Sequence, residues 1–447
     1  MTNDDAEKVL TALLDKAKAA GADAADVVLA ESVSVGVTYR MGAVEDVERS
    51  EAQDLGLRVL VGKRQAIVSS TDHAPETLDE LVTRAVAMAK LAPEDPYCGL
   101  APDDKLAKAP FKDLDLFDPA EPSADRLTEM AREAEETALA VKGVTNSSGA
   151  SAGWGSGAKW LMTSSGFFGG SKGSSHSVSC AVLAGEGVGM ERDYDYHSTR
   201  HGAELEAAEK IGRTAGERAV ARLNPKKLKS RQSTVVYDKR LSASLIGHLA
   251  GAINGGAVAR GVSFLKDKLG EKIFSDAITI IDDPHMVRGA GSRAFDGEGV
   301  ANARRAIVDK GVLTGWVMNS AHARQLGLET TGNATRGTGG PPGASTTNFY
   351  MEAGSSARDE LLADIAEGLL VTDMFGPQVN PNTGDYSVGV SGFWLEKGEI
   401  AYPVSEITIA GNILQMYQNL TAADDLEFRG STNAPTLVVE GMTIAGE

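Results

Sequence analysis

One stretch of the sequence has the form of a metal-binding helix. Residues 241–256 carry apolar side chains at helical spacing and end in glycines, with His248 in their apolar part. This spacing predicts a helix with one buried face. A zinc protease helix needs a second histidine about one turn on and a glutamate beside the first. Here the corresponding positions are Leu249, Ala252 and Ile253, so the expected ligands are absent.

A second histidine arrangement has a spacing that suits zinc. His197 and His201 are four residues apart, which lets two imidazoles chelate a metal when the segment is helical. No glutamate follows His197, and residues 193–196 have the pattern of a strand end. We therefore interpret the two histidines as a surface pair.

Two glycine-rich stretches resemble nucleotide loops only in part. Residues 289–294 match a dinucleotide glycine pattern, but residues 295–299 cannot open the helix that would hold a pyrophosphate. Residues 339–343 contain no lysine, as a phosphate-binding loop would require. We expect the first to bind no nucleotide and the second to be a flexible cover or turn.

No nucleophile motif is complete. Cys98 lies in a proline-rich stretch, and Cys180 lies in an alternating apolar run that is typical of a core. Residues 153–157 contain a serine between glycines, but they lack the strand-to-helix elbow of a hydrolase. We identify no catalytic residue from these patterns.

The composition is that of a folded, acidic protein. The chain has 447 residues, a net charge of −18 and 50 glycines against 24 aromatic residues. The acidic charge argues against nucleic-acid binding, which needs clustered Lys and Arg. Two distant cysteines form neither a disulfide framework nor a cysteine-only zinc site, which fits a reducing cytoplasm. We expect no signal peptide and no membrane span, and hence a cytoplasmic protein.

The elements that must position these residues differ between the two halves of the chain. We expect an α+β fold with an N-terminal α/β domain over 1–225, built on an antiparallel sheet and long helices, and a C-terminal mostly β domain over 226–447. In the first half the patterns predict helices at 4–20, 76–91, 123–141 and about 203–223, and a β meander at 26–70 with turns at 40–43 and 61–64. They also predict a proline-rich connector at 93–122 and several strands joined by glycine turns at 147–195.

In the second half a strand at 234–237 leads into the helix at 241–256. Short alternating runs then predict strands at 278–281, 305–308, 311–317, 386–390, 392–395, 407–409 and 436–439. The basic run 226–232 between the halves is interpreted as a solvated linker.

Several separated motifs, in order, resemble the TldD/PmbA family, described as modulators of DNA gyrase and as cytosolic metalloproteases. The most diagnostic are 247–252, 283–285 with 291–299, and the closing run 435–446. The resemblance also includes 56–59 and 192–196 and extends over essentially the whole chain. The motifs together look like the PmbA (TldE) branch.

The resemblance implies that the metal site has been lost from this chain. In the TldD branch the same helix carries His-Glu-x-x-x-His, and a later cysteine completes the zinc site. The equivalent positions here are Gly247, His248 and Ala252, and no cysteine follows Cys180. The resemblance therefore implies no catalytic residue and no metal in this chain, with zinc on a TldD-like partner.

A pseudo-enzyme subunit of a heterodimer is the function that the resemblance implies. The pair would act on extended or unfolded peptides, in precursor-leader processing and antitoxin degradation, without nucleic acid or membrane. Which residues contact the peptide is left open, as is a homodimer when the partner is absent. Two alternatives also stay open: a stand-alone peptidase with an unrecognised site, and a binding protein that modulates DNA gyrase.

Overall fold

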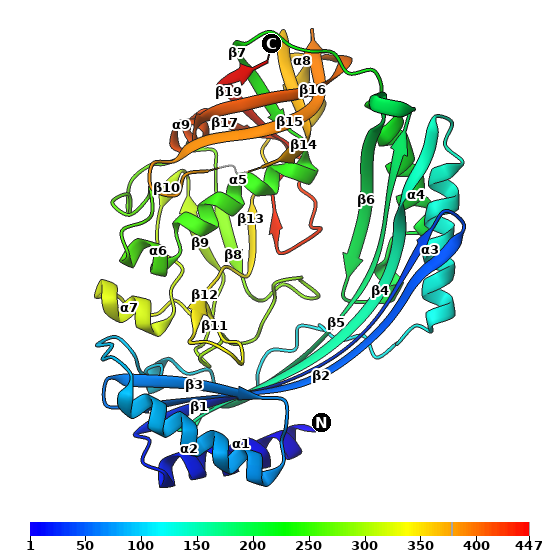
Figure 1. Ribbon diagram of the computed structural model, residues 1–447. Helices are drawn as coiled ribbons and strands as arrows, with labels where there is room; N and C mark the ends of the chain where they lie inside the picture. The colour runs from blue at the N-terminus through cyan, green and yellow to red at the C-terminus, as the bar shows by residue number, and fades with distance from the viewer. Residues whose placement is uncertain (377–378, 447) are drawn as a thin grey trace.

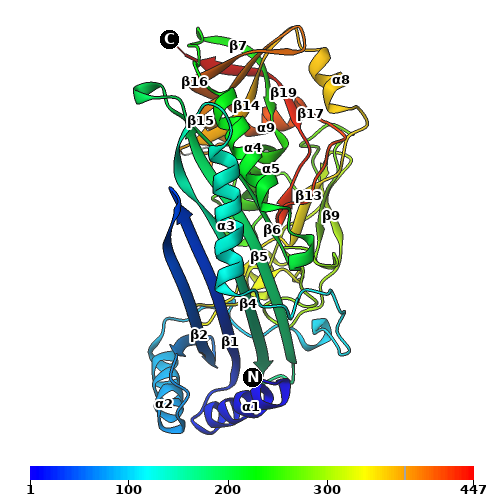
Figure 2. The ribbon, with the colours of Figure 1, turned by 90° about the vertical axis from the view of Figure 1, so that its right-hand side faces the viewer.

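The computed structural model describes residues 1–376 and 379–446, and it has the mixed α+β architecture that the sequence predicts. A six-stranded antiparallel sheet in the order β3-β2-β1-β4-β5-β6 dominates the first half of the chain. Its strands are β1 (Ala24–Arg40), β2 (Ala43–Val61), β3 (Arg64–Ser70), β4 (Val144–Thr163), β5 (Phe168–Ala184) and β6 (Glu191–Thr199). Its long strands curve, and the C-terminal part lies on their concave side (Figures 1 and 2).

The predicted meander is confirmed, together with both of its turns. Met41 and Gly42 have φ values of 49° and 84°, and they join β1 to β2 in a tight hairpin. Gly62, at φ 58°, begins the turn from β2 to β3. Positive φ at these sites suits glycine and matches the twist of a two-residue hairpin.

The predicted strands joined by glycine turns at 147–195 are confirmed. This region consists of the long strands β4 and β5, followed by β6. Most of its glycines lie inside the strands in ordinary extended backbone, with Gly155 opposite Ser175 and Gly157 opposite Gly173. Gly166, at φ 100°, lies in the turn between β4 and β5. Gly185 and Gly187, at φ 84° and 58°, lie between β5 and β6.

Four helices lie against this sheet, in two pairs. α1 (Asn3–Ala19) and α2 (Pro75–Leu91) pack near one end, and α3 (Ala124–Leu139) and α4 (Ala208–Ala221) pack near the other. α4 starts later than predicted, because residues 202–204 form a separate 3-10 turn. Each helix buries a stripe of small or aliphatic residues, such as Leu10 and Leu13 on α1.

The proline-rich connector at 93–122 has little regular structure, but parts of it are buried against the rest of the protein. It contains one 3-10 turn, Asp103–Lys105. Phe111 contacts Phe295 of the C-terminal part at a ring distance of 4.8 Å, and Leu114 is buried. The connector therefore contributes to the contact between the long sheet and the C-terminal part.

The C-terminal part is built mainly of strands, as expected. A mixed six-stranded sheet has the order β16-β15-β14-β7-β19-β17, a smaller sheet has the order β10-β9-β8-β13-β18, and β11 pairs with β12. The strands are β7 (Arg231–Tyr237), β8 (Ile280–Asp283), β9 (Arg305–Asp309), β10 (Val312–Leu313), β11 (Ala334–Thr335), β12 (Gly343–Ala344), β13 (Asn348–Met351), β14 (Glu367–Phe375), β15 (Asp385–Glu396), β16 (Glu399–Asn412), β17 (Leu420–Ala422), β18 (Thr432–Asn433) and β19 (Leu437–Ala445).

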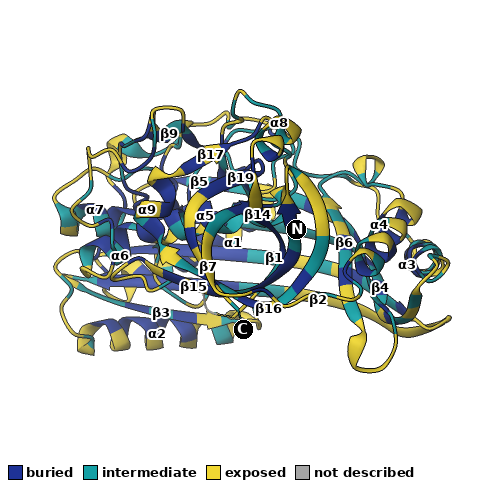
Figure 3. Cartoon of the chain, turned by 90° about the horizontal axis from the view of Figure 1, so that it is seen from above, coloured by how far each residue is buried: buried dark blue, intermediate teal, exposed yellow. Residues whose placement is uncertain are grey.

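The helices of this part are α5 (Lys239–Ala252), α6 (Gly255–Ala259), α7 (Ser320–Leu326), α8 (Arg358–Ala363) and α9 (Ile413–Gln418). Buried residues from α5 and the surrounding strands form one large hydrophobic cluster, seen as dark blue segments in Figure 3. The predicted strand 311–317 shortens to β10, and the two predicted strands at 386–395 form the single strand β15.

The predicted helix 241–256 is two helices. Asn254 interrupts it, because its side chain accepts a hydrogen bond from the Gly256 backbone nitrogen at 2.9 Å and caps α6. Gly255 then pairs with the Val317 carbonyl at 2.8 Å. The division of the chain at residue 225 stays a prediction. In the described residues no helix is long and apolar enough to cross a bilayer.

Candidate functional site

The helix α5 is held by its buried face, as the sequence predicts. Leu245, Ile246 and Leu249 are completely buried in the large C-terminal cluster. Asp238 caps the helix by accepting from the Arg240 backbone nitrogen at 3.1 Å. The Tyr417 hydroxyl donates to the Leu245 carbonyl at 2.7 Å. Burial and capping therefore fix the position and the rotation of α5.

The three positions singled out on α5 lie in different surroundings. Gly247 is exposed, and a Cβ built on it would meet no atom within 4 Å. His248 is half-buried, with its ring 6.0 Å from the Tyr386 ring in an edge-on arrangement. Ala252 is buried. Their equivalence to a lost metal site stays a prediction.

These residues do not fit a zinc ion of the kind that the TldD branch is described as holding on this helix. Glycine and alanine side chains have no donor atom, so the three positions together offer one imidazole. Across residues 1–376 and 379–446, no group of three or more His, Cys, Asp or Glu side chains could hold a metal ion. We therefore derive no chemical step through a metal on this chain.

The small residues in and after α5 differ in how closely they pack. Gly247 and Gly251 face open space. Gly255 and Gly256 do pack closely, since an added Cβ would lie 2.6 Å from Met318 Cγ and 2.8 Å from His322 Cε1, respectively. Small residues at the end of α5 and in α6 thus serve packing, whereas those in the middle of α5 leave an open face.

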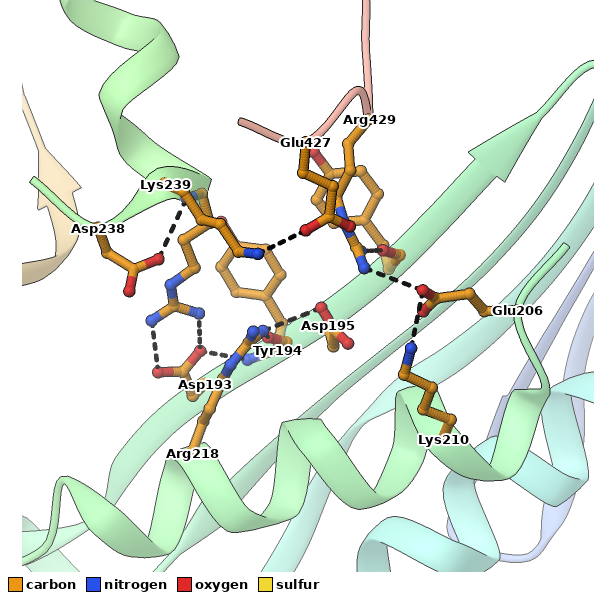
Figure 4. Close-up of polar contacts among 12 residues, drawn as sticks. Asp193, Tyr194, Asp195, Glu206, Lys210, Arg218, Asp238, Lys239, Glu427 and Arg429 are labelled. Atoms are coloured by element: carbon orange, nitrogen blue, oxygen red, sulfur yellow. Dashed lines mark hydrogen bonds and ion pairs between the residues drawn. The ribbon is translucent and has the colours of Figure 1, made fainter. Parts of the chain in front are cut away.

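A cluster of ion pairs joins the start of α5 to the edge strand β6 (Figure 4). Arg240 donates to both oxygens of Asp193 at 2.7 and 3.0 Å. Asp193 is almost fully buried, and burial raises the pKa of its carboxyl. The hydrogen bonds and charge of Arg240 outweigh this effect, so the pKa of Asp193 lies below its usual value. The pair therefore fixes α5 against β6.

A second group of ion pairs extends this cluster to the loop before β18. The whole set, Asp193, Lys239, Arg240, Glu427 and Arg429, is here called the β6 clamp. Glu427 accepts from Lys239 at 2.7 Å and from Arg429 at 2.6 Å. Burial raises the pKa of Glu427, but the hydrogen bonds and charges of these two cations outweigh burial and lower the pKa to about 2. Arg429 also donates to the Tyr196 carbonyl at 2.9 Å and to Glu206 at 3.1 Å (Figure 4).

A cavity of about 1000 Å³ lies along β6. The described residues pair β6 with β5 on one side only, so its other side is a sheet edge. Residues 196–200, 286–290 and 428–430 line this cavity. It is here called the edge groove.

The remaining sequence candidates are structural. His197 lies on β6 and accepts from the Glu206 backbone nitrogen at 3.1 Å, whereas His201 contacts the Asp115 carbonyl at 3.0 Å. His197 lies in β6 and His201 lies beyond its end, so the two are not on one helix, and both are half-buried rather than on the surface. Cys98 and Cys180 are buried, and burial raises the pKa of Cys180 to about 12, as expected of a core thiol.

The glycine-rich stretches form neither a nucleotide-binding loop nor a nucleophile elbow. Residues 295–299 form no helix, as predicted. Residues 153–157 lie within β4, so they form no nucleophile elbow. Part of the 339–343 stretch forms β12, which pairs with β11.

Sequence reasoning missed a group of cations over the middle of the long sheet. Lys159, Lys172, Arg200 and Arg293 line one cavity of about 660 Å³, together with Lys112 of the connector. These residues are spread over 182 positions, from 112 to 293 inclusive, and none lies in a basic run. Only the folded sheet brings them together, so no local signal identifies them.

Comparison with known proteins identifies the family. Three family models match in order: PmbA/TldA metallopeptidase domain 1 at 25–89, the central domain at 117–223 and the C-terminal domain at 230–446. The chain is 39% identical to the metalloprotease PmbA of Escherichia coli O157:H7, over 95% of this chain and 93% of that protein. It is 36% identical to a PmbA homologue of Haemophilus influenzae, over 97% and 94% of the two chains.

Solved structures agree with this result. A Bacteroides thetaiotaomicron protein named as a modulator of DNA gyrase superposes with a TM-score of 0.92 at 31% identity, covering 99% of each chain. TldE from Thermococcus kodakarensis shares the fold, with a TM-score of 0.87 at 22% identity over 98% of this chain and 100% of that chain. The chain therefore belongs to the PmbA/TldD family.

Proposed function

We propose that this chain is the non-catalytic, PmbA/TldE-like subunit of a cytoplasmic TldD–TldE type metalloprotease. A TldD-like partner would carry the zinc, and the pair would cleave unfolded peptides such as precursor leaders and antitoxins. The observation that carries this proposal is the set of side chains on α5. Gly247 and Ala252 supply no ligand, and His248 packs edge-on against Tyr386.

The edge groove supports a role in holding the peptide. An extended peptide can pair with a free sheet edge, and its backbone hydrogen bonds make such binding tolerant of sequence. Arg218 and Arg429 already donate to the Tyr194 and Tyr196 carbonyls, which leaves residues 197–199 of β6 for a peptide. An unfolded substrate suits this geometry because a folded one offers no free backbone.

The experiment compares this chain alone, a TldD-like protein alone and their mixture on an unstructured peptide, with and without a chelator. We expect chelator-sensitive cleavage that is greatest in the mixture. Equal cleavage by the TldD-like protein with and without this chain would refute the subunit role. Chelator-resistant cleavage by this chain alone would instead establish a separate peptidase.

Metal content is a second, independent measurement. After dialysis against zinc and removal of free metal, we expect the isolated chain to retain far less than one zinc per molecule. Stoichiometric zinc that is lost on substitution of His248 would contradict the proposal.

A further inference from the structure

The cavity over the middle of the long sheet has an unusual charge for this protein. It measures about 660 Å³, and its floor is formed by β1, β4 and β5. Residues 111–114 and 116 of the connector and 292–294 of the C-terminal part form its walls. Five cations line it, Lys112, Lys159, Lys172, Arg200 and Arg293, against one carboxylate, Asp113. The chain as a whole has a net charge of −18, so this concentration of positive charge is local.

The two arginines of this cavity are held by neutral groups. Arg200 donates to the carbonyls of Ser174 and Ala290 at 3.1 and 2.6 Å. Arg293 donates to the carbonyls of Ala334 and Ser345 at 3.2 and 3.0 Å. The Nε atom of each arginine is buried and has no hydrogen-bond partner. Backbone carbonyls fix the direction of these guanidinium groups without forming an ion pair. Burial lowers the pKa of both arginines, and for Arg293 the charges of Asp296 and Asp282 offset this effect only in part.

Of the three lysines, Lys159 is half-buried, whereas Lys112 and Lys172 are exposed at the mouth of the cavity. Lys159 donates to the Arg336 carbonyl, Lys172 lies 3.6 Å from the centre of the Phe117 ring, and Lys112 contacts His285 at 2.9 Å. Within the described part of the chain, none of the five cations forms an ion pair with a carboxylate. Burial and the charges of Arg336 and Arg293 lower the pKa of Lys159 to about 8. An uncompensated, partly buried cation is costly, which points to a ligand that supplies the missing negative charge.

Two further cavities adjoin this one, on opposite sides, and share lining residues with it. Ser175 and Arg200 also line the edge groove, so the two spaces meet there. On the other side, Lys159, Ser171 and Arg293 also line a cavity of about 330 Å³ that contains Asp296 and Arg336. The three spaces follow one path across the concave side of the sheet. A path of this form suits an extended chain rather than a compact small molecule.

The lining favours a peptide over a nucleic acid. Among the described residues that line this cavity, Phe111 is the one aromatic, and β4 and β5 contribute mainly glycine and serine to its floor. Proteins that bind single-stranded nucleic acid rely on aromatic rings for base stacking. Carboxylate side chains, in contrast, need only the cations.

We propose that this cavity, here called the basic cavity, binds acidic segments of unfolded peptides and gives the subunit a preference for glutamate- and aspartate-rich substrates. The proposal rests on the proposed function only in taking an unfolded peptide as the ligand. The edge groove would hold backbone without regard to sequence, and the basic cavity would add selection by charge.

The test measures binding of labelled peptides to the isolated full-length chain by fluorescence anisotropy. The probes are a Glu/Ser peptide, its Gln/Ser isostere, a single-stranded oligonucleotide of equal charge, and inorganic phosphate as a competitor. We expect the Glu/Ser peptide to bind about tenfold more tightly than the isostere, a difference that shrinks with added salt. Phosphate should compete only weakly, since it contacts few of the cations at once.

The variant K112Q/K172Q removes two exposed cations from the basic cavity, and the control K8Q/K18Q removes two exposed cations from α1. We expect the cavity variant to lose most of the acidic preference and the control to keep it. Equal binding of the two peptides, an equal loss in both variants, or tighter binding of the oligonucleotide would overturn the proposal.

This measurement separates the basic cavity from the proposed subunit role. It uses no partner, so acidic preference without any effect on cleavage in the mixture would leave the cavity assignment standing and refute the subunit role. If this chain stimulates cleavage by the TldD-like protein but shows no preference for the acidic peptide, the subunit role stands and the cavity assignment is refuted.

Discussion

Arg240 at the start of α5 and Asp193 on β6 form a two-pronged ion pair, with nitrogen–oxygen distances of 2.7 and 3.0 Å. Their sequence positions are 47 residues apart, and their side chains are 15% and 2% exposed. This pair directly connects the long N-terminal sheet to the helix on which a metal site would stand. It therefore links the placement of α5 to the edge groove.

Removing one partner of this pair should destabilise the protein strongly. Asp193→Asn leaves Arg240 and Arg222 with reduced compensation, and a broken buried pair costs about 3 kcal/mol or more. Urea unfolding of the variant measures the change in the free energy of unfolding. The exposed pair Arg49–Glu121 is the matched control, since Glu121→Gln should cost less than about 1 kcal/mol. Similar losses in the two variants would contradict a special role for Asp193.

Glu427 should make the stability of the β6 clamp depend on pH. Its pKa falls from the ordinary value of 4.5 to about 2, so its charged form is favoured in the folded state. The stabilisation is fully present above about pH 4.5 and is lost as the pH falls through about 2. We expect Glu427→Gln to be less stable than the wild type at pH 7 and nearly equal to it at the lowest pH at which both fold. A difference that does not shrink in acid would argue against this assignment.

The charge of Lys159 should lower the free energy of unfolding of the protein. Its pKa is lowered from 10.5 to about 8 by burial and by Arg336 and Arg293, so the folded state disfavours its charge. The cost is complete below about pH 8, and stability should rise as the pH increases from about 8 to 10.5.

Lys159→Met removes this charge and should stabilise the protein at pH 7 by about 1–3 kcal/mol, with a smaller gain at pH 10. Thermal or urea unfolding at the two pH values measures the difference. Destabilisation at pH 7 would show that the hydrogen bond to the Arg336 carbonyl outweighs the buried charge.

The two classes of glycine around α5 should respond oppositely to alanine. Gly247→Ala adds a methyl group into open space in a helix interior, so we expect a gain of about 0.5–1 kcal/mol. Gly255→Ala places its methyl group 2.6 Å from Met318 Cγ, so we expect a loss of about 1–3 kcal/mol. Denaturant midpoints of the two variants check this. A loss at Gly247 equal to that at Gly255 would mean that the middle of α5 is covered.

Much of the fold could be predicted from the sequence because its signals are local. The apolar periodicity that placed Leu245, Ile246 and Leu249 on one face of α5 is a property of neighbouring residues, and the structure buries all three. Turn glycines such as Gly42 were found for the same reason. The lengths of β4 and β5 were not predicted, because the pairing partners of their extended glycines, such as Ser175 opposite Gly155, lie in another strand.

For the candidate site, too, the identity of the residues could be predicted from the sequence, whereas their surroundings could not. The sequence by itself determined that Gly247, His248 and Ala252 supply one donor atom among them, because the identity of a side chain does not depend on the fold. Only the tertiary structure decided that Gly247 is open and Ala252 buried, and that Arg240 meets Asp193. It alone gathered Lys112, Lys172 and the other cations into one cavity, since strand pairing and chain crossings bring together charges that are far apart in sequence.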